Sequence, residues 1–124
     1  MLLEGGAEVE APISNNNTAL HFAALRVCVE VCRLLLDWGA KVDTPRNRKY
    51  TPLLEAARGG HLSVVKLLVE RGADVNVRNV FDRNASEEAG SFGNKDVAEW
   101  LDVVVKKWDL KENVSTLKIL NIHV

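Results

Sequence analysis

The sequence repeats with a period of 33 residues, and this periodicity constrains the fold more than any other feature. The segment TALHFAA at residues 18–24 realigns with TPLLEAA at 51–57 and, more faintly, with NASEEAG at 84–90. A second marker keeps the same step, since GAEV, GAKV and GADV begin at residues 6, 39 and 72. Two markers in one register predict consecutive units of one structure, which must stack because a single unit cannot bury its apolar face.

The middle unit indicates that each repeat consists of two helices. Thr51 can cap a first helix, and Pro52 at the first helical position loses no hydrogen bond and already has a helical φ. This helix is predicted to end at Gly59–Gly60, since glycine adopts the left-handed conformation that terminates helices. A second helix is predicted over residues 61–71, with an apolar stripe at helical spacing, and Gly72 ends it. The stripe consists of Val64, Leu67, Leu68 and Arg71.

The patterns TPLHxAA, GH, VxLLL and GADVN at this spacing resemble the ankyrin repeat over about residues 2–107. The resemblance implies an all-α, L-shaped solenoid of stacked helix-turn-helix units with β-hairpin-like finger loops. In such a solenoid the fingers and the first helices form a concave face. We expect an ankyrin-repeat domain at residues 1–108, made of a partial repeat (1–13), two repeats (14–46 and 47–79) and a capping repeat (80–108), followed by a C-terminal tail at 109–124.

Three departures from the ankyrin pattern predict local irregularities. Arg26–Val27 stands where the next repeat has Gly59–Gly60, and valine is strained in a left-handed conformation, so we expect a distorted turn. In the fingers, the usual glycine is replaced by Asn16, Lys49 and Asp82, which predicts irregular fingers. Leu54 replaces the family histidine, so hydrogen bonds made by His21 should be missing from the second repeat.

Both ends of the chain depart from the repeat. Residues 1–5 keep only the end of a second helix, so we expect an open solenoid end that exposes Leu20 and Leu34. This predicts a fragment, an alternative product of a longer array, or a molecule that self-associates through this end. At the other end, Trp100 and Trp108 are expected to close the stack on one helical face. Residues 109–124 fit an amphipathic helix, a strand, or a ligand for a PDZ domain through their last three residues.

Composition and motifs exclude several classes of protein. Sixteen Lys and Arg against seventeen Asp and Glu give a formal net charge of −1, so no overall field attracts nucleic acid or an anionic membrane. Without a leader sequence or a segment of about 18 uncharged apolar residues, we expect an intracellular protein, cytoplasmic or nuclear. Cys28 and Cys32 are interpreted as small buried hydrophobes, and His21 as structural. We therefore predict no enzyme, no cofactor, no metal and no small-molecule substrate.

The resemblance also implies which residues contact a partner protein. In ankyrin repeats these are variable finger positions and the positions that follow the two alanines of the first helix. They correspond here to Asn15, Asn17, Leu25, Arg26, Asn47, Arg48, Tyr50, Arg58, Val80, Phe81, Arg83, Ser91 and Phe92. Tyr, Phe and Arg are enriched among interface hot spots. The competing interpretation is that Tyr50 packs against the next finger and that the arginines are merely solvated.

Basic residues gather on neighbouring fingers despite the neutral total charge. They are Arg46, Arg48, Lys49, Arg78 and Arg83. We therefore expect a protein partner that presents an acidic or mixed acidic and apolar segment to a scaffold, adaptor or inhibitor. Two alternatives stay open: an ankyrin piece that targets or regulates an enzyme within a longer parent chain, and a weak binder of nucleic acid or lipid headgroups through the basic fingers.

Overall fold

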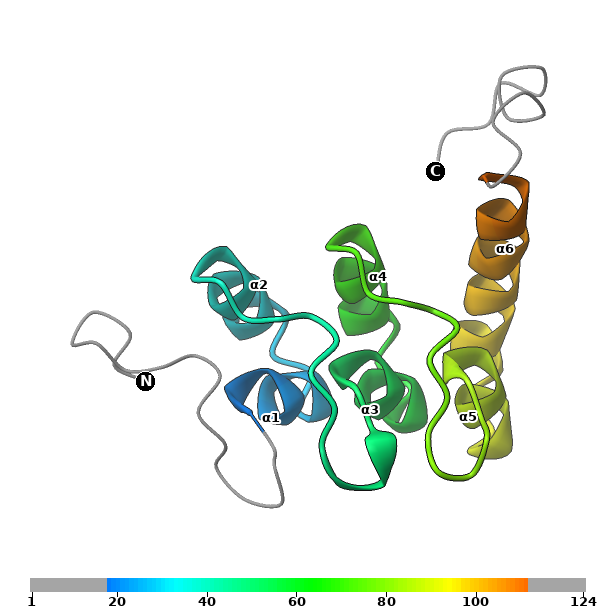
Figure 1. Ribbon diagram of the computed structural model, residues 1–124, viewed down its shortest axis with the longest axis horizontal. Coiled ribbons are helices and arrows are strands. Elements are labelled where there is room, and N and C mark those ends of the chain that lie inside the picture. Colours follow the sequence, from blue (N-terminus) through cyan, green and yellow to red (C-terminus); the bar gives the residue numbers. More distant parts are fainter. Residues whose placement is uncertain (1–17, 112–124) are drawn as a thin grey trace.

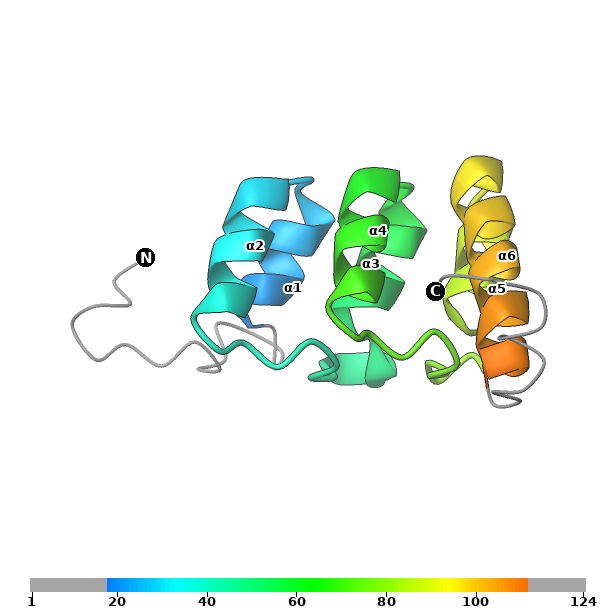
Figure 2. The same ribbon diagram turned by 90° about the horizontal axis from the view of Figure 1, so that it is seen from above.

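The structure, a computed structural model, describes residues 18–111, and these residues form pairs of helices as predicted from the repeat. Its elements in chain order are α1 (Ala19–Leu25), α2 (Val29–Asp37), the 3₁₀ helix η1 (Asn47–Lys49), α3 (Pro52–Gly59), α4 (Leu62–Glu70), α5 (Ala85–Ser91) and α6 (Lys95–Lys111). The helices form three antiparallel pairs that stand in a row (Figure 1). Viewed from above, successive pairs stack side by side (Figure 2). The all-α solenoid predicted from the repeat is confirmed.

The stacking produces two layers of helices. The first helices α1, α3 and α5 pack on one another in order, and the second helices α2, α4 and α6 do the same in a second layer, with α2 and α4 above α1 and α3 in Figure 1. The interior is one continuous cluster of buried apolar side chains. Its largest fully buried members are Leu20, Leu35, Leu53, Leu54, Leu68 and Leu101. A shared interior explains why the period of the sequence must be maintained, since each unit buries its apolar face against the next.

Polar contacts add to the stacking at the ends of the helices. The Nε2 of His61 donates to the carbonyl of Leu25 in the preceding unit at 2.9 Å. One repeat later, Nδ2 of Asn94 donates to two carbonyls at the C-terminal end of α3, at 3.0 and 2.8 Å. The carboxylate of Asp43 accepts from the backbone N–H of Asp74 at 3.1 Å. Helix ends leave carbonyl groups without partners, so the bonds from His61 and Asn94 tie neighbouring units where the backbone needs them.

The helix starts follow from the capping residues. The Thr51 hydroxyl accepts from the N–H of Leu54 at 3.3 Å, with Pro52 at the first position of α3. Asn84 and Glu87 form a reciprocal capping box, in which Asn84 Oδ1 accepts from Glu87 N at 2.9 Å. Both caps satisfy N–H groups that have no partner inside the helix. The predicted cap at Thr51 is therefore confirmed.

The turns between paired helices share one conformation, which corrects the prediction of a distorted first turn. Val27, Gly60 and Gly93 all have positive φ, at 61°, 76° and 78°. Each turn closes with a hydrogen bond of 2.8–3.1 Å from the next residue to a carbonyl five positions earlier. All three turns keep this shape because the stacking of the units requires it. Val27 is therefore held in a left-handed conformation, which costs about 1–2 kcal/mol for a residue with a Cβ.

The fingers are tight turns without β-strands in residues 18–111. The finger at residues 46–50 closes through Arg46 N donating to Tyr50 O at 2.8 Å, and the finger at 79–83 closes through a 3.0 Å bond between its end residues. Lys49 and Asp82 have φ of 58° and 59°, so the positions that usually hold glycine do need a left-handed residue. Arg48 adds a second left-handed residue, which makes the first of these fingers irregular as expected. Asn16 lies outside the described residues.

His21 is a structural residue, as predicted. It is 1% exposed, its Nδ1 accepts from the N–H of Thr18 at 3.2 Å, and its Nε2 donates to the carbonyl of Tyr50 at 3.0 Å. Leu54 at the equivalent position is 1% exposed and can form no such bonds. The histidine therefore bridges the first unit to the next finger, whereas the leucine contributes only apolar packing.

Two predictions about exposure were wrong. Leu20 is 1% exposed and belongs to the common core, although Leu34 is 47% exposed as expected. Leu20 is covered because the packing of α1 on α3 places it in the interior. Cys32 is buried, which raises its pKa to about 11, but Cys28 is exposed because it stands at the N-cap of α2, outside the buried stripe of that helix.

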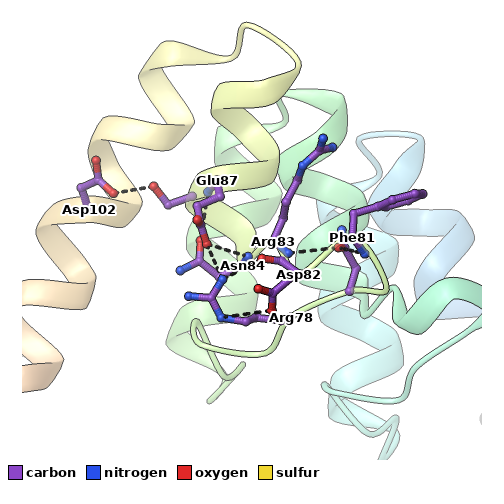
Figure 3. A network of polar contacts seen from close by, with 9 residues as sticks. Arg78, Phe81, Asp82, Arg83, Asn84, Glu87 and Asp102 are labelled. Atoms are coloured by element: carbon purple, nitrogen blue, oxygen red, sulfur yellow. Dashed lines mark hydrogen bonds and ion pairs between the residues drawn. The ribbon is translucent and has the colours of Figure 1, made fainter.

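The third helix pair keeps a polar residue where the other repeats have leucine. Ser86 Oγ donates to the carbonyl of Ala98 at 3.3 Å and to the carboxylate of Asp102, a contact drawn in Figure 3. Helix α6 continues to residue 111, so it passes the predicted domain end at 108 without a break. Trp100 is partly buried, with Lys66 Nζ 5.9 Å from its ring centre. The side chain of Trp108 and the tail beyond residue 111 lie outside the described residues.

Candidate functional site

An open hollow of about 420 Å³ lies between the two described fingers and the ends of the first helices. We call it the arginine hollow. It is lined by Arg46, Asn47, Arg48, Tyr50, Arg58, Phe81, Arg83 and Phe92. All of these except Arg46 belong to the set of partner contacts predicted from the sequence, so the fold brings most of that set together.

Neighbouring fingers are joined at the rim of the hollow. The N–H of Val80 donates to the carbonyl of Arg48 at 3.0 Å. Within the 79–83 finger, Asn79 is 4% exposed and its Oδ1 accepts from the N–H groups of Phe81 and Arg83 at 2.9 and 3.2 Å. These bonds fix the backbone from which Phe81 and Arg83 project (Figure 3). The rim is therefore held before any partner arrives.

Two of the arginines are paired with buried carboxylates. Arg46 Nε donates to Glu55, whose side chain is 3% exposed, and Arg83 Nη1 lies 3.3 Å from Oε1 of the fully buried Glu88. Glu55 and Glu88 occupy equivalent positions of α3 and α5. Neither glutamate was among the predicted site residues, although two glutamates 33 residues apart beside the small core alanines were the available signal. Their role is to hold the arginine side chains in position.

The other two arginines have no carboxylate within ion-pair distance among residues 18–111. Arg58 instead lies between two rings, 5.0 Å from the centre of Phe92 and 5.7 Å from that of Tyr50. The helix end that carries Arg58 is held by Asn94. Arg48 stands on the exposed turn of the 46–50 finger. Four guanidinium groups thus line the hollow and only two of them are paired with carboxylates, which leaves a local surplus of positive charge.

Tyr50 forms the floor of the hollow and is not a surface residue. It is 3% exposed, and its hydroxyl donates to Glu88 in the next repeat. Burial, followed by the neighbouring Glu88 carboxylate, raises its pKa to about 12. Arg46 lies 4.6 Å above the ring. Tyr50 therefore packs toward the following repeat, as in the competing interpretation, and its hydroxyl meets the first helix of that repeat, α5.

The remaining predicted contacts lie around the hollow or outside the described residues. Leu25 is 46% exposed and lines a smaller hollow of about 220 Å³ together with His21, Phe22, Arg46 and Glu55. The side chains of Arg26, Val80 and Ser91 are exposed but do not line the arginine hollow. Asn15 and Asn17 lie outside the described residues.

Arg78 does not contribute to the surplus charge. Its Nη1 donates to Glu87 and to the carbonyl of Asp82, both at 2.8 Å, in the network shown in Figure 3. Arg78 was predicted to belong to the basic fingers because it is close to the other finger arginines along the chain. The fold places it beside an acidic helix start instead, so its charge is neutralised locally.

The comparison with known families decides what kind of protein carries this site. The family described as ankyrin repeats, in three copies, matches residues 1–79 and 39–107. The chain belongs to the ankyrin-repeat family. Ankyrin repeats are generally non-enzymatic modules of protein–protein interaction. No curated protein matches the chain.

The described residues of this ankyrin-repeat protein show neither a membrane-spanning helix nor a metal-binding cluster. In the described part of the chain, no helix has the length and apolar character needed to cross a membrane. Over the same residues, no group of three or more His, Cys, Asp or Glu side chains is placed to hold a metal ion.

Proposed function

We propose that this ankyrin-repeat protein binds another protein in the arginine hollow, as a scaffold, adaptor or inhibitor. The observation that carries the proposal is the composition of the hollow. Phe81 and Phe92 are 50% and 48% exposed, Phe92 stands beside Arg58, and neither Arg58 nor Arg48 of the hollow has a carboxylate partner in residues 18–111. Exposed aromatic rings next to guanidinium groups are typical of binding hot spots and are costly to leave in water.

The charge of the hollow supports a partner with an acidic and apolar segment. Arg48 and Arg58 can each donate hydrogen bonds to a carboxylate, while the two phenylalanine rings offer apolar contact. The whole chain carries a formal net charge of only −1, so attraction to the partner is local to this face. We therefore propose a short acidic stretch with at least one large apolar side chain.

The rigidity of the site favours binding. Because the fingers are joined by backbone bonds and Arg58 is held between two rings, few side chains need to be ordered on association. Preorganisation reduces the entropic cost of binding, which is about 0.5–1.5 kcal/mol for each immobilised flexible side chain. The lower entropic cost allows a small solenoid to bind a partner protein through a surface as limited as the arginine hollow.

We place this binding inside the cell. Both cysteines of the chain, Cys28 and Cys32, are free thiols, and Cys28 is exposed. Exposed unpaired thiols are typical of reducing compartments such as the cytoplasm and the nucleus.

The proposal is tested with a triple variant, Arg48→Ala, Arg58→Ala and Phe81→Ala. Tyr50 is left unchanged because its burial makes it part of the fold. The matched control is Arg33→Ala, Val103→Ala and Lys106→Ala, which removes two charges and one exposed apolar side chain from the second helices. Pull-down with quantitative mass spectrometry should show proteins that are captured by the wild type and the control but lost with the triple variant.

Far-UV circular dichroism of all three proteins accompanies the pull-down, and their spectra and thermal midpoints should agree. Equal capture by the triple variant and the wild type would refute the arginine hollow as the binding site. Loss of capture with the control alone would place the interface on the second helices.

A further inference from the structure

We propose that the arginine hollow binds a phosphotyrosine side chain of the partner, so that phosphorylation of the partner promotes binding. This inference rests on the proposed function and names both the ligand and its regulation. It follows from the two guanidinium groups without a carboxylate partner, the ring contacts of Arg58 and the two exposed aromatic rings of the hollow.

Charge selects a dianion over a single carboxylate. Of the four guanidinium groups in the hollow, Arg46 and Arg83 are paired with Glu55 and Glu88, and the other two have no carboxylate partner in residues 18–111. The surplus is therefore two positive charges. One aspartate or glutamate would neutralise half of it, whereas a phosphorylated side chain carries about −1.5 to −2 at neutral pH. A single phosphoryl group matches the hollow.

The orientation of the arginines suits phosphate. Arg58 is held between the rings of Phe92 and Tyr50, and Arg46 is held above Tyr50 by its bond to Glu55. Stacking leaves the edge of a guanidinium group available, and this edge presents two parallel N–H donors. Phosphate oxygens accept such a pair in bidentate fashion. These contacts restrict the rotation of Arg58 and Arg46, so phosphate recognition costs less entropy at these two side chains than it would with freely rotating ones.

The aromatic rings select tyrosine among the phosphorylated residues. Phe81 and Phe92 are half exposed and line the hollow from the 79–83 finger and from the end of α5, and Arg83 lies 5.6 Å from the Phe81 ring centre. Phosphoserine or phosphothreonine would offer neither phenylalanine ring an aromatic contact. A phosphotyrosine side chain joins an aromatic ring to the dianion, so it can stack on the phenylalanines while its phosphoryl group meets the arginines. The volume of about 420 Å³ is within the usual range of ligand sites, roughly 300–1,000 Å³.

The test uses four degenerate nonapeptide libraries that differ only in the central residue: phosphotyrosine, tyrosine, glutamate or phosphoserine. Each library carries a fluorophore and is titrated with the full chain by fluorescence anisotropy at fixed moderate salt. We expect the phosphotyrosine library to bind about 10- to 100-fold more tightly than the tyrosine and glutamate libraries, because several hydrogen bonds to a charged group are gained. The phosphoserine library should be weaker than the phosphotyrosine library.

Variants locate the binding. Arg58→Ala and Arg48→Ala should each reduce affinity for the phosphotyrosine library by about tenfold or more, whereas Arg33→Ala, which removes an equal charge from α2, should leave it unchanged. Arg58→Lys keeps the charge but loses the planar fork, so it should bind more weakly than wild type. Amide chemical shifts in ¹⁵N NMR spectra should change around Phe81 and Phe92.

The outcomes separate this inference from the proposed function. If the glutamate library binds as tightly as the phosphotyrosine library and both depend on Arg48 and Arg58, phosphotyrosine recognition is overturned but the binding surface stands. Equal affinity for phosphoserine overturns the choice of tyrosine. Tighter binding to vesicles of phosphatidylcholine with a phosphoinositide, again through Arg58, would assign the hollow to a lipid headgroup instead. If no library binds and the triple variant still captures the wild-type proteins, both proposals fail.

Discussion

Removing the hydroxyl group of Tyr50 should weaken the stack between the second and third repeats. In Tyr50→Phe the ring remains above the core, but the fully buried Glu88 loses the donor that Tyr50 provides and keeps Arg83 at 3.3 Å. Hydrogen bonds to charged groups in buried sites contribute about 1.5–3 kcal/mol, so the free energy of unfolding should fall by about that amount. For a domain of roughly 100 residues this corresponds to a decrease of roughly 10 °C in Tm.

The measurement is urea unfolding followed by far-UV circular dichroism at pH 7, combined with a double-mutant cycle. Tyr50→Phe, Glu88→Gln and the double variant are compared with the wild type. The coupling between the two residues should be about 1 kcal/mol or more, because they share one buried bond. A loss below about 0.5 kcal/mol in Tyr50→Phe, or strictly additive effects, would contradict the inter-repeat role assigned to this bond.

Other changes test the turns and the buried thiol. Val27→Gly should raise the free energy of unfolding by about 0.5–1 kcal/mol in a urea titration, because relief of left-handed strain exceeds the added entropy of the unfolded chain; a decrease would contradict the strain at φ 61°. Gly60→Ala should lower it by about 1–2 kcal/mol, since φ is +76° and the new Cβ would lie 2.7 Å from Asn94 Oδ1; an unchanged urea midpoint would contradict this. Burial raises the pKa of Cys32 from 9.0 to about 11, so the unfolded state ionises first and stability should fall as pH rises from 9 to 11. Cys32→Ala should show a smaller fall in Tm over that range, and an identical pH profile would exclude the thiol as its cause.

The helix pairs could be predicted because their signals are local. Thr51 and Pro52 start α3 through bonds within one turn, and Gly60 ends it through its own φ. Such contacts lie only a few residues apart, so the sequence contains both partners in one window. The same reasoning failed at Val27, because the stacked units impose the turn and valine accepts it against its own preference.

The candidate partner contacts were predicted as a list, but not the separate places that they take in the fold. Tyr50 and Phe81 looked alike as aromatic finger residues, yet one is 3% exposed and the other 50%. The difference arises from Glu88, which is 38 residues from Tyr50 along the chain and accepts its hydroxyl. Likewise, Arg78 and Arg58 carry the same charge, and only the fold decides that Arg78 meets a carboxylate while Arg58 meets two rings.

The period of 33 residues, the helix boundaries in its middle unit and the membership of the ankyrin-repeat family were therefore present in the chain itself. The arginine hollow was decided by stacking, because its arginines, carboxylates and rings come from different repeats. The repeat pattern contains the residues that each unit needs in order to fold, because the contacts of those residues recur in every unit. Burial and charge pairing at a binding surface depend on which non-repeating side chains meet across units, and that is settled only when the units pack.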